Sequence, residues 1–244
     1  MNTASRPSLP HYRLRRRTAG FTALGATLTM LFAVAALGQG APQAARAGAQ
    51  PQVLAGSYEQ TPFTLTRPYV GVLWRDSRPV GKPNRGALIR GTKLPPQGAT
   101  FFSWDPVRKR SPSPQARRYA TDKLIRVVLR MADEYARANP GAPRLAIGDL
   151  SKPGGGRFAG AFHASHQNGL DADIYYPRLD RRERSPWNVT DIDLKLAQDL
   201  VDRFVRAGAT YVFVGPRTPL KGPRGVVMAL PRHDNHMHVR LPPG

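Results

Sequence analysis

Five of the six histidines in this 244-residue chain lie in two short, widely separated segments. The first segment is His163-Ala164-Ser165-His166, and the second is His233-Asp234-Asn235-His236-Met237-His238. Carboxylates accompany both, because Asp171 and Asp173 follow the first segment and Asp234 lies within the second. Histidines scattered through a hydrophobic core would not gather in this way. A fold that satisfies the sequence must therefore bring two distant polar segments to one place.

The spacing inside each segment indicates how the side chains would meet. Side chains two residues apart in a β-strand point to the same face. His236 and His238 would share one face of a strand and Asp171 and Asp173 one face of another, with the intervening residues turned to the core. Asn168-Gly169 is a turn signal that can fold the chain back before the aspartates. One histidine from a loop, one aspartate from a strand and one histidine from a second strand can thus converge on a metal ion.

Two histidines and one aspartate suit a catalytic zinc ion, which keeps one coordination position for water. The absence of cysteine excludes disulfides, cysteine nucleophiles and thiolate zinc sites. Zinc is the best candidate among borderline metals, with manganese and iron as alternatives. The chain contains no HExxH or GxSxG motif. Gly154-Gly155-Gly156-Arg157 lacks the Lys-Ser/Thr of a phosphate-binding loop and is interpreted as a flexible loop near the site.

Apolar periodicity predicts two amphipathic helices. Apolar residues recur at helical spacing over residues 121–138, and Asn139-Pro140-Gly141 ends this segment. A second helix opens at Asp191, keeps its apolar residues on one face and is capped by Gly208.

Short apolar runs predict strands over residues 145–148, 171–176, 211–214, 226–230 and 237–241. Residues 61–105 are rich in Pro and Gly and predict short strands with long loops, and the basic stretch 107–118 predicts a solvated loop. This mixture predicts an α+β fold in which a small central antiparallel sheet carries the metal site, flanked by two long helices and long loops.

The first 47 residues have the composition of an export segment. Residues 13–17 include four arginines, residues 19–37 carry no charge, and the small-residue pattern Ala45-Arg46-Ala47 follows. An uncharged stretch behind a basic cluster argues against a core helix and leaves a cleaved signal peptide or an uncleaved membrane anchor. We therefore divide the chain into 1–47, the signal peptide or anchor, 48–60, a linker, and 61–244, the domain that carries the site. The protein is expected in the periplasm or the cell-wall space.

The net charge indicates what kind of partner the protein meets. The chain has 37 Lys and Arg against 16 Asp and Glu, a net charge of +21. Six of these arginines and no acidic residue lie in the first 47 residues, so the remainder still carries +15. Such a surface favours nucleic acid, anionic lipid or an acidic cell-wall polymer. An exported protein meets cell-wall polymer before DNA, so no nucleic-acid partner is expected, and membrane contact is expected only through an uncleaved N-terminal segment.

The sequence around both histidine segments resembles the penicillin-insensitive murein endopeptidases. The matching stretches are IGDL at 147–150, GGRF at 155–158, HASHQNGLDADI at 163–174 and HDNHMHVRL at 233–241, with a looser match over 86–95. The family belongs to the lysostaphin and D-Ala-D-Ala metallopeptidase superfamily, which is marked by HxxxxxxD followed later by HxH. The resemblance implies a zinc metallopeptidase domain that hydrolyses D-alanyl–diaminopimelate cross-links of peptidoglycan, an acidic polymer, by a metal-activated water.

The resemblance also implies which residues bind the metal. It makes His166, Asp173 and His238 the ligands of one zinc ion per chain. His163 is an additional ligand or a close neighbour.

Catalytic and supporting roles follow from the same resemblance. His236 falls at the position of the general base, and His233 lies near the same water. The residues expected to orient the imidazoles are Asp171, Ser165 and Gln167.

Two features depart from the family, and two alternative functions stay open. Cysteine is absent, whereas enterobacterial members carry disulfides. The segment between the two motifs is short, so the substrate-binding loops are expected to differ from those of the family. One alternative is a D-Ala-D-Ala carboxypeptidase or dipeptidase on the same scaffold. The other is a non-catalytic cell-wall-binding protein, against which the complete ligand set together with His236 argues.

Overall fold

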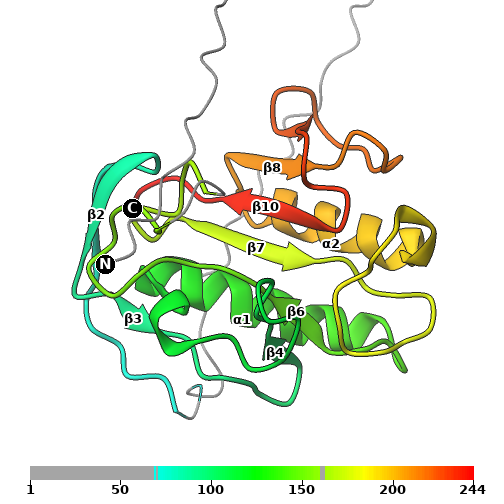
Figure 1. Cartoon of the computed structure of the whole chain (residues 1–244), viewed down its shortest axis with the longest axis horizontal. Coiled ribbons are helices and arrows are strands. Elements are labelled where there is room, and N and C mark those ends of the chain that lie inside the picture. Colours follow the sequence, from blue (N-terminus) through cyan, green and yellow to red (C-terminus); the bar gives the residue numbers. More distant parts are fainter. Residues whose placement is uncertain (1–68, 70, 160–162) are drawn as a thin grey trace, which may run out of the picture. The chain divides into compact units, whose positions relative to one another are not determined.

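The computed structural model describes residue 69, residues 71–159 and residues 163–244 (Figure 1). The predicted export segment, 1–47, and the predicted linker, 48–60, lie outside the described residues. Among the described residues, no helix is both long enough and apolar enough to cross a membrane.

Six strands form the main sheet, in the order β4 (Phe101–Ser103), β6 (Leu145–Ile147), β7 (Asp171–Tyr175), β10 (His236–Arg240), β8 (Tyr211–Val214) and β9 (Val227–Ala229). The four inner strands pair antiparallel, whereas the outermost strands, β4 and β9, pair parallel with their neighbours. Two short pairs lie outside this sheet, namely β1 (Arg78–Lys82) with β2 (Arg85–Ile89) and β3 (Thr92–Lys93) with β5 (Tyr119–Ala120). The predicted α+β fold with a small central sheet is confirmed.

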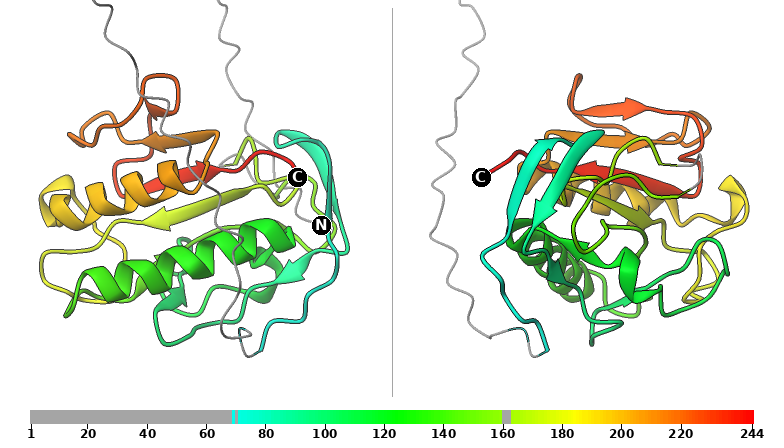
Figure 2. Two further views of the ribbon diagram at one scale, coloured as in Figure 1. Left: turned by 180° about the vertical axis from the view of Figure 1, so that it is seen from behind. Right: turned by 60° about the vertical axis from the view of Figure 1, so that its left-hand side comes forward.

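Two α-helices of the described chain cover one face of the main sheet, as the view from behind shows (Figure 2). α1 (Asp122–Ala138) begins after Thr121, whose side chain accepts a hydrogen bond from the backbone of Leu124. This helix is confirmed as predicted. α2 (Leu194–Arg206) is capped in the same way by Asp193 and begins later than predicted, because Val189–Asp191 forms a separate 3-10 turn before it.

The main sheet is apolar on the helix side and polar on the other. Ala172 and Ile174 of β7 and Met237 and Val239 of β10 have no exposed surface and belong to the core under the helices. Residues alternate between the two faces of a strand. The aspartates of β7 and the histidines of β10 therefore lie on the uncovered face, as their spacing predicted.

A second, smaller apolar cluster covers part of that other face. It consists of Phe102, Trp104, Ala146 and Tyr175, all buried. These side chains come from β4 and its C-terminal end, β6 and β7, so the cluster borders the polar part of the sheet on one side. The aspartates and histidines therefore have an apolar wall next to them.

The predicted strands are all present, with small differences at their ends. β10 begins at His236, one residue earlier than predicted, so both histidines of the HxH pair lie inside the strand. The prediction of a solvated loop over 107–118 is wrong at its end. Arg118 is buried and donates to the carbonyl of Leu94, and Arg117 pairs with the buried Asp149.

The triglycine segment is a hydrogen-bonded turn, not the flexible loop that the sequence suggested. The amide of Leu88 donates to the Gly154 carbonyl (3.0 Å), and the amide of Gly156 donates to the Gln167 carbonyl (2.8 Å). Gly155 has φ +71°, and a Cβ there would lie 2.2 Å from the Gln167 carbonyl oxygen. Glycine is thus required where this turn joins β2 to the loop that precedes β7.

Gly155→Ala should destabilise the protein, because alanine would have to adopt a left-handed φ and its Cβ would clash with the Gln167 carbonyl oxygen. The expected loss in free energy of unfolding is about 2–4 kcal/mol. Gly154→Ala is the matched control, since a Cβ at Gly154 has nothing within 4 Å, and its effect should stay within about 0.5 kcal/mol. Urea unfolding of the two variants checks this, and equal stabilities would contradict the packing described.

Candidate metal centre

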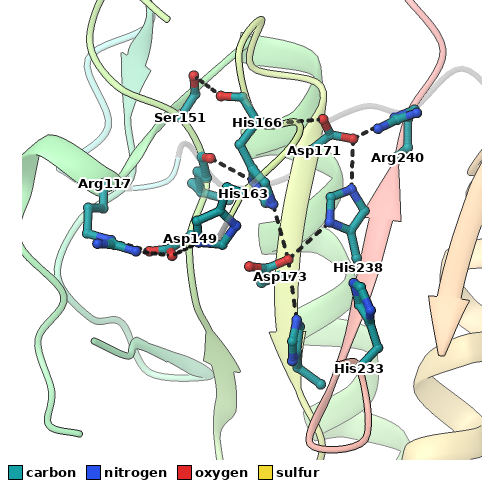
Figure 3. Close-up of polar contacts among 12 residues, drawn as sticks. Arg117, Asp149, Ser151, His163, His166, Asp171, Asp173, His233, His238 and Arg240 are labelled. Atoms are coloured by element: carbon teal, nitrogen blue, oxygen red, sulfur yellow. Dashed lines mark hydrogen bonds and ion pairs between the residues drawn. The ribbon is translucent and has the colours of Figure 1, made fainter. Parts of the chain in front are cut away.

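Antiparallel pairing of β7 with β10 assembles the centre from cross-strand pairs. Asp173 lies opposite His238, and Asp171 lies opposite Arg240. Both pairs occupy the face that the helices leave uncovered, where their side chains point toward one another (Figure 3). The first histidine segment directly precedes β7, and the second one runs into β10. The pairing of these two strands therefore brings the two segments together, as predicted.

Imidazoles from two elements meet at the Asp173 carboxylate. Its Oδ1 atom lies 3.2 Å from His166 Nε2, 3.2 Å from His238 Nδ1 and 3.8 Å from His236 Nε2. Burial by itself raises the pKa of Asp173, but its interactions with His166, His236 and His238 hold the pKa well below its usual value. Asp173 is therefore an ionised, buried carboxylate surrounded by ring nitrogens.

His166 is held in one orientation by its backbone and by its ring. Its φ of +66° is uncommon for a residue other than glycine. Its amide donates to Asp171 Oδ2 (3.0 Å), and its carbonyl accepts from Ser151 Oγ (2.6 Å). Its Nδ1 lies 2.8 Å from the Leu150 carbonyl, which can only accept, so Nδ1 carries the proton. The other ring nitrogen, Nε2, is left to face Asp173.

Asp171 orients the second imidazole of the centre. Its wholly buried Oδ1 accepts from His238 Nε2 (3.0 Å) and from Arg240 Nε (2.7 Å). With Nε2 engaged, His238 directs Nδ1 at Asp173. Burial lowers the pKa of His238, but the neighbouring carboxylates of Asp171 and Asp173 outweigh burial and raise the pKa to about 9. A metal ion bound at Nδ1 would displace a proton from His238.

Two buried atoms of the centre lack the partners that burial requires. His166 Nε2 and Asp173 Oδ1 have no hydrogen-bond partner among the described residues. Buried polar atoms that make no hydrogen bond are unfavourable in a protein interior. A cation bound to both atoms removes this cost. His163, His166 and Asp173 also offer ligand atoms within 4.8 Å of one another. The residues present therefore suit a metal ion.

A buried ion pair holds His163 beside this centre. His163 Nε2 lies 2.8 Å from Asp149 Oδ2, and the Arg117 guanidinium contacts both oxygens of Asp149 through Nε and Nη2. Burial raises the pKa of Asp149, but the hydrogen bonds from Arg117 and His163 bring it below its usual value. The rings of His163 and His166 meet edge to face at 4.9 Å. Asp149 thus anchors His163 next to the centre.

Two further histidines line the centre on the side of β10. His236 Nδ1 lies 2.7 Å from Asn235 Oδ1, and His233 Nδ1 lies 2.9 Å from the Pro231 carbonyl, so each Nδ1 carries a proton. Burial lowers the pKa of His236 to about 4 and also lowers the pKa of His233. Both rings are neutral at pH 7, and they lie 4.8 Å apart. The His236 lone pair is directed at Asp173 and can accept a proton.

The structure gathers most, but not all, of the residues singled out from the sequence. The five clustered histidines lie together with Asp171 and Asp173. Ser165 makes no hydrogen bond within the described residues, and Gln167 donates to the Ala164 carbonyl (3.3 Å), not to an imidazole. Asp171 makes supporting contacts to His166 and His238. Further supporting contacts come from residues that the sequence analysis missed, which are Ser151, Arg117, Asp149 and Arg240.

Fold and site together define an α+β protein with a candidate metal centre of histidines and aspartates on the open face of its sheet. The family model for penicillin-insensitive murein endopeptidases matches residues 79–206, just over half of the chain. The chain belongs to the penicillin-insensitive murein endopeptidase family. The matched region contains the first histidine segment and both aspartates of β7, whereas the second segment follows it.

Relatives that bear the name penicillin-insensitive murein endopeptidase show the extent of the likeness. The protein of Haemophilus influenzae (strain ATCC 51907 / DSM 11121 / KW20 / Rd) is 36% identical over 196 residues, which cover 67% of this chain and 63% of the relative. The proteins of Klebsiella pneumoniae subsp. pneumoniae and Escherichia coli (strain K12 / DH10B) are 30% and 28% identical, over 60% of this chain and 47% of each relative. This chain thus spans between about half and under two thirds of these relatives.

Asp171→Asn should weaken metal binding although Asp171 is not among the expected ligands. An amide cannot accept all three N–H groups that Asp171 accepts, so the orientation of His166 and His238 should loosen. The affinity for added Zn²⁺ is expected to fall about 10–100-fold, as measured by competition with a chromophoric chelator. Asp202→Asn, on α2 under the other face of the sheet, is the control and should bind as the wild type does. Unchanged affinity in Asp171→Asn would contradict this role.

Proposed function

We propose that this protein is a zinc-dependent murein endopeptidase that hydrolyses peptide cross-links of peptidoglycan of the D-alanyl–diaminopimelate type. The single observation that carries the proposal is the convergence of His166 Nε2 and His238 Nδ1 on the buried Asp173 Oδ1. Family membership supports the choice of substrate, because the relatives are named as murein endopeptidases.

His166, Asp173 and His238 would hold one zinc ion per chain, with His163 as a further ligand or a close neighbour. Two neutral imidazoles and one carboxylate leave the ion one positive charge. When bound, zinc supplies Lewis acidity for a scissile carbonyl and a water whose pKa is about 7. The chain itself contributes the orientation of the ligands, which Asp171 and Ser151 maintain through the hydrogen bonds described above.

His236 would act as the general base. Asn235 holds its Nδ1 proton, so Nε2 is free to take a proton from the attacking water and to deliver it to the leaving amine. No glutamate lies in either histidine segment to compete for this role. His233, neutral and next to His236, would lie near the same water.

Charge and the N-terminal segment support the location of this activity. Peptidoglycan stems carry carboxylates, and a net charge of +15 beyond the first 47 residues would concentrate the protein near them at low salt. Residues 1–47 have the composition of an export segment, which supports the periplasm or the cell-wall space.

Digestion of purified sacculi tests the proposed function. The zinc-loaded protein should convert cross-linked muropeptides into monomers, whereas pentapeptide stems should stay intact. Removal of zinc with a chelator should abolish the cleavage, and added zinc should restore it. Trimming of pentapeptide stems without loss of cross-links would instead indicate a carboxypeptidase, and binding without cleavage would indicate a cell-wall-binding protein.

Two histidine variants should separate metal binding from proton transfer. His238→Ala is expected to lose zinc and activity together. His236→Ala should keep most of its zinc yet lose about 10²–10⁴-fold in hydrolysis, the usual contribution of general acid–base catalysis. Zinc content and cross-link cleavage are measured on the same preparations. A metal-free or fully active His236→Ala would show that its assigned role is wrong.

A further inference from the structure

Arg240, at the end of β10, presents an anchored guanidinium next to the centre. Its Nε donates to Asp171 Oδ1 at 2.7 Å, and its side chain is 22% exposed. Its two terminal nitrogens, Nη1 and Nη2, have no hydrogen-bond partner within the described part of the chain. One end of the guanidinium is thus fixed by a buried carboxylate while the other end is free to bind a ligand.

Aromatic side chains fix this guanidinium from β8. The Arg240 guanidinium lies over the Tyr211 ring at 5.8 Å, and Tyr211 stacks on Phe213 at 5.6 Å. Phe213 in turn contacts the His238 ring at 5.7 Å. A continuous aromatic surface therefore runs along β8 from Arg240 to the metal ligand. Less conformational entropy is lost on binding when a side chain is held in this way.

Arg240 also lies close in the sheet to the proposed metal ligand His238. It is two residues from His238 in the same strand and on the same face, a separation of about 6.5 Å along the strand. The guanidinium on the opposite side of the centre belongs to Arg117, which is engaged by both oxygens of Asp149. Arg240 is therefore better placed than Arg117 to contact a substrate that is bound at the metal.

We propose that Arg240 is a specificity-determining residue that binds a substrate carboxylate on the carbon next to the scissile amide nitrogen. This inference rests on the proposed function. In a D-alanyl–diaminopimelate cross-link the acylated amine is attached to a carbon that carries a free carboxylate, whereas the equivalent carbon of a lysine cross-link carries none. A guanidinium offers two parallel N–H donors that match a carboxylate. Arg240 therefore distinguishes the two cross-links.

A matched pair of substrates tests this assignment. Both are acyl-D-alanyl peptides joined to a side-chain amine, one of diaminopimelate and the other of lysine, so they differ only in the carboxylate. Wild-type enzyme should have a kcat/KM roughly 10- to 100-fold higher for the diaminopimelate peptide, the usual effect of a hydrogen-bonded charge. Arg240→Gln should bring this ratio of kcat/KM values close to one. Arg240→Lys keeps the positive charge but loses the two parallel N–H donors, so its ratio should lie between those of the wild type and Arg240→Gln.

Arg206→Gln is the control, because Arg206 is an exposed arginine in the last turn of α2. It should keep the wild-type ratio. Arg240 also holds Asp171, so a role in positioning alone would lower kcat/KM for both peptides equally and leave the ratio unchanged. That result would overturn the proposal.

Binding to the metal-free protein gives a second readout that is independent of catalysis. In an NMR titration the diaminopimelate peptide should bind metal-stripped wild type more tightly than the lysine peptide, and Arg240→Gln should abolish this difference. Equal binding of the two peptides to the wild type would contradict the proposal. Failure of the zinc-loaded wild type to cleave either peptide would refute the proposed function instead, and equal cleavage of both would refute only the role of Arg240.

Discussion

The pairing of β7 with β10 is the constraint on which the rest of the structure depends. It sets Asp173 opposite His238 and Asp171 opposite Arg240, so one register determines every contact between the two strands. The register is held from the other face, where Ala172 and the alternating apolar residues of both strands pack under the helices. A slip by one residue would turn these apolar side chains outward and bury the polar ones. The hydrophobic core thus specifies the geometry of the polar centre.

Asp171 transmits that geometry to the proposed metal ligands. One buried carboxylate accepts hydrogen bonds from the His166 amide, the His238 ring and Arg240, and so it joins a loop to a strand. His238 uses Nε2 for its bond to Asp171, and His166 uses Nδ1 for its bond to the Leu150 carbonyl. The other ring nitrogen of each histidine therefore faces Asp173. The ligands are therefore arranged before a metal ion arrives, and little reorganisation is needed on binding.

The sequence predicted what depends on local periodicity and missed what depends on tertiary contact. The two-residue spacing correctly placed the aspartates and histidines on one strand face, and the same rule could have identified Arg240. Ser151 and the Arg117–Asp149 pair could not be found in this way, because their contacts join segments that meet only in the folded chain. Support was expected from Ser165, adjacent in sequence, but the left-handed backbone of His166 is held by Ser151 instead.

Anomalous diffraction at the zinc edge, on crystals of the zinc-loaded protein, tests the central claim most directly. The account predicts one principal peak bonded to His166 Nε2, to His238 Nδ1 and to the Asp173 carboxylate, with Asp171 still bound to His238 Nε2. A peak bonded to His238 through Nε2, or an ion held by Asp149 and His163 without His238, would contradict it.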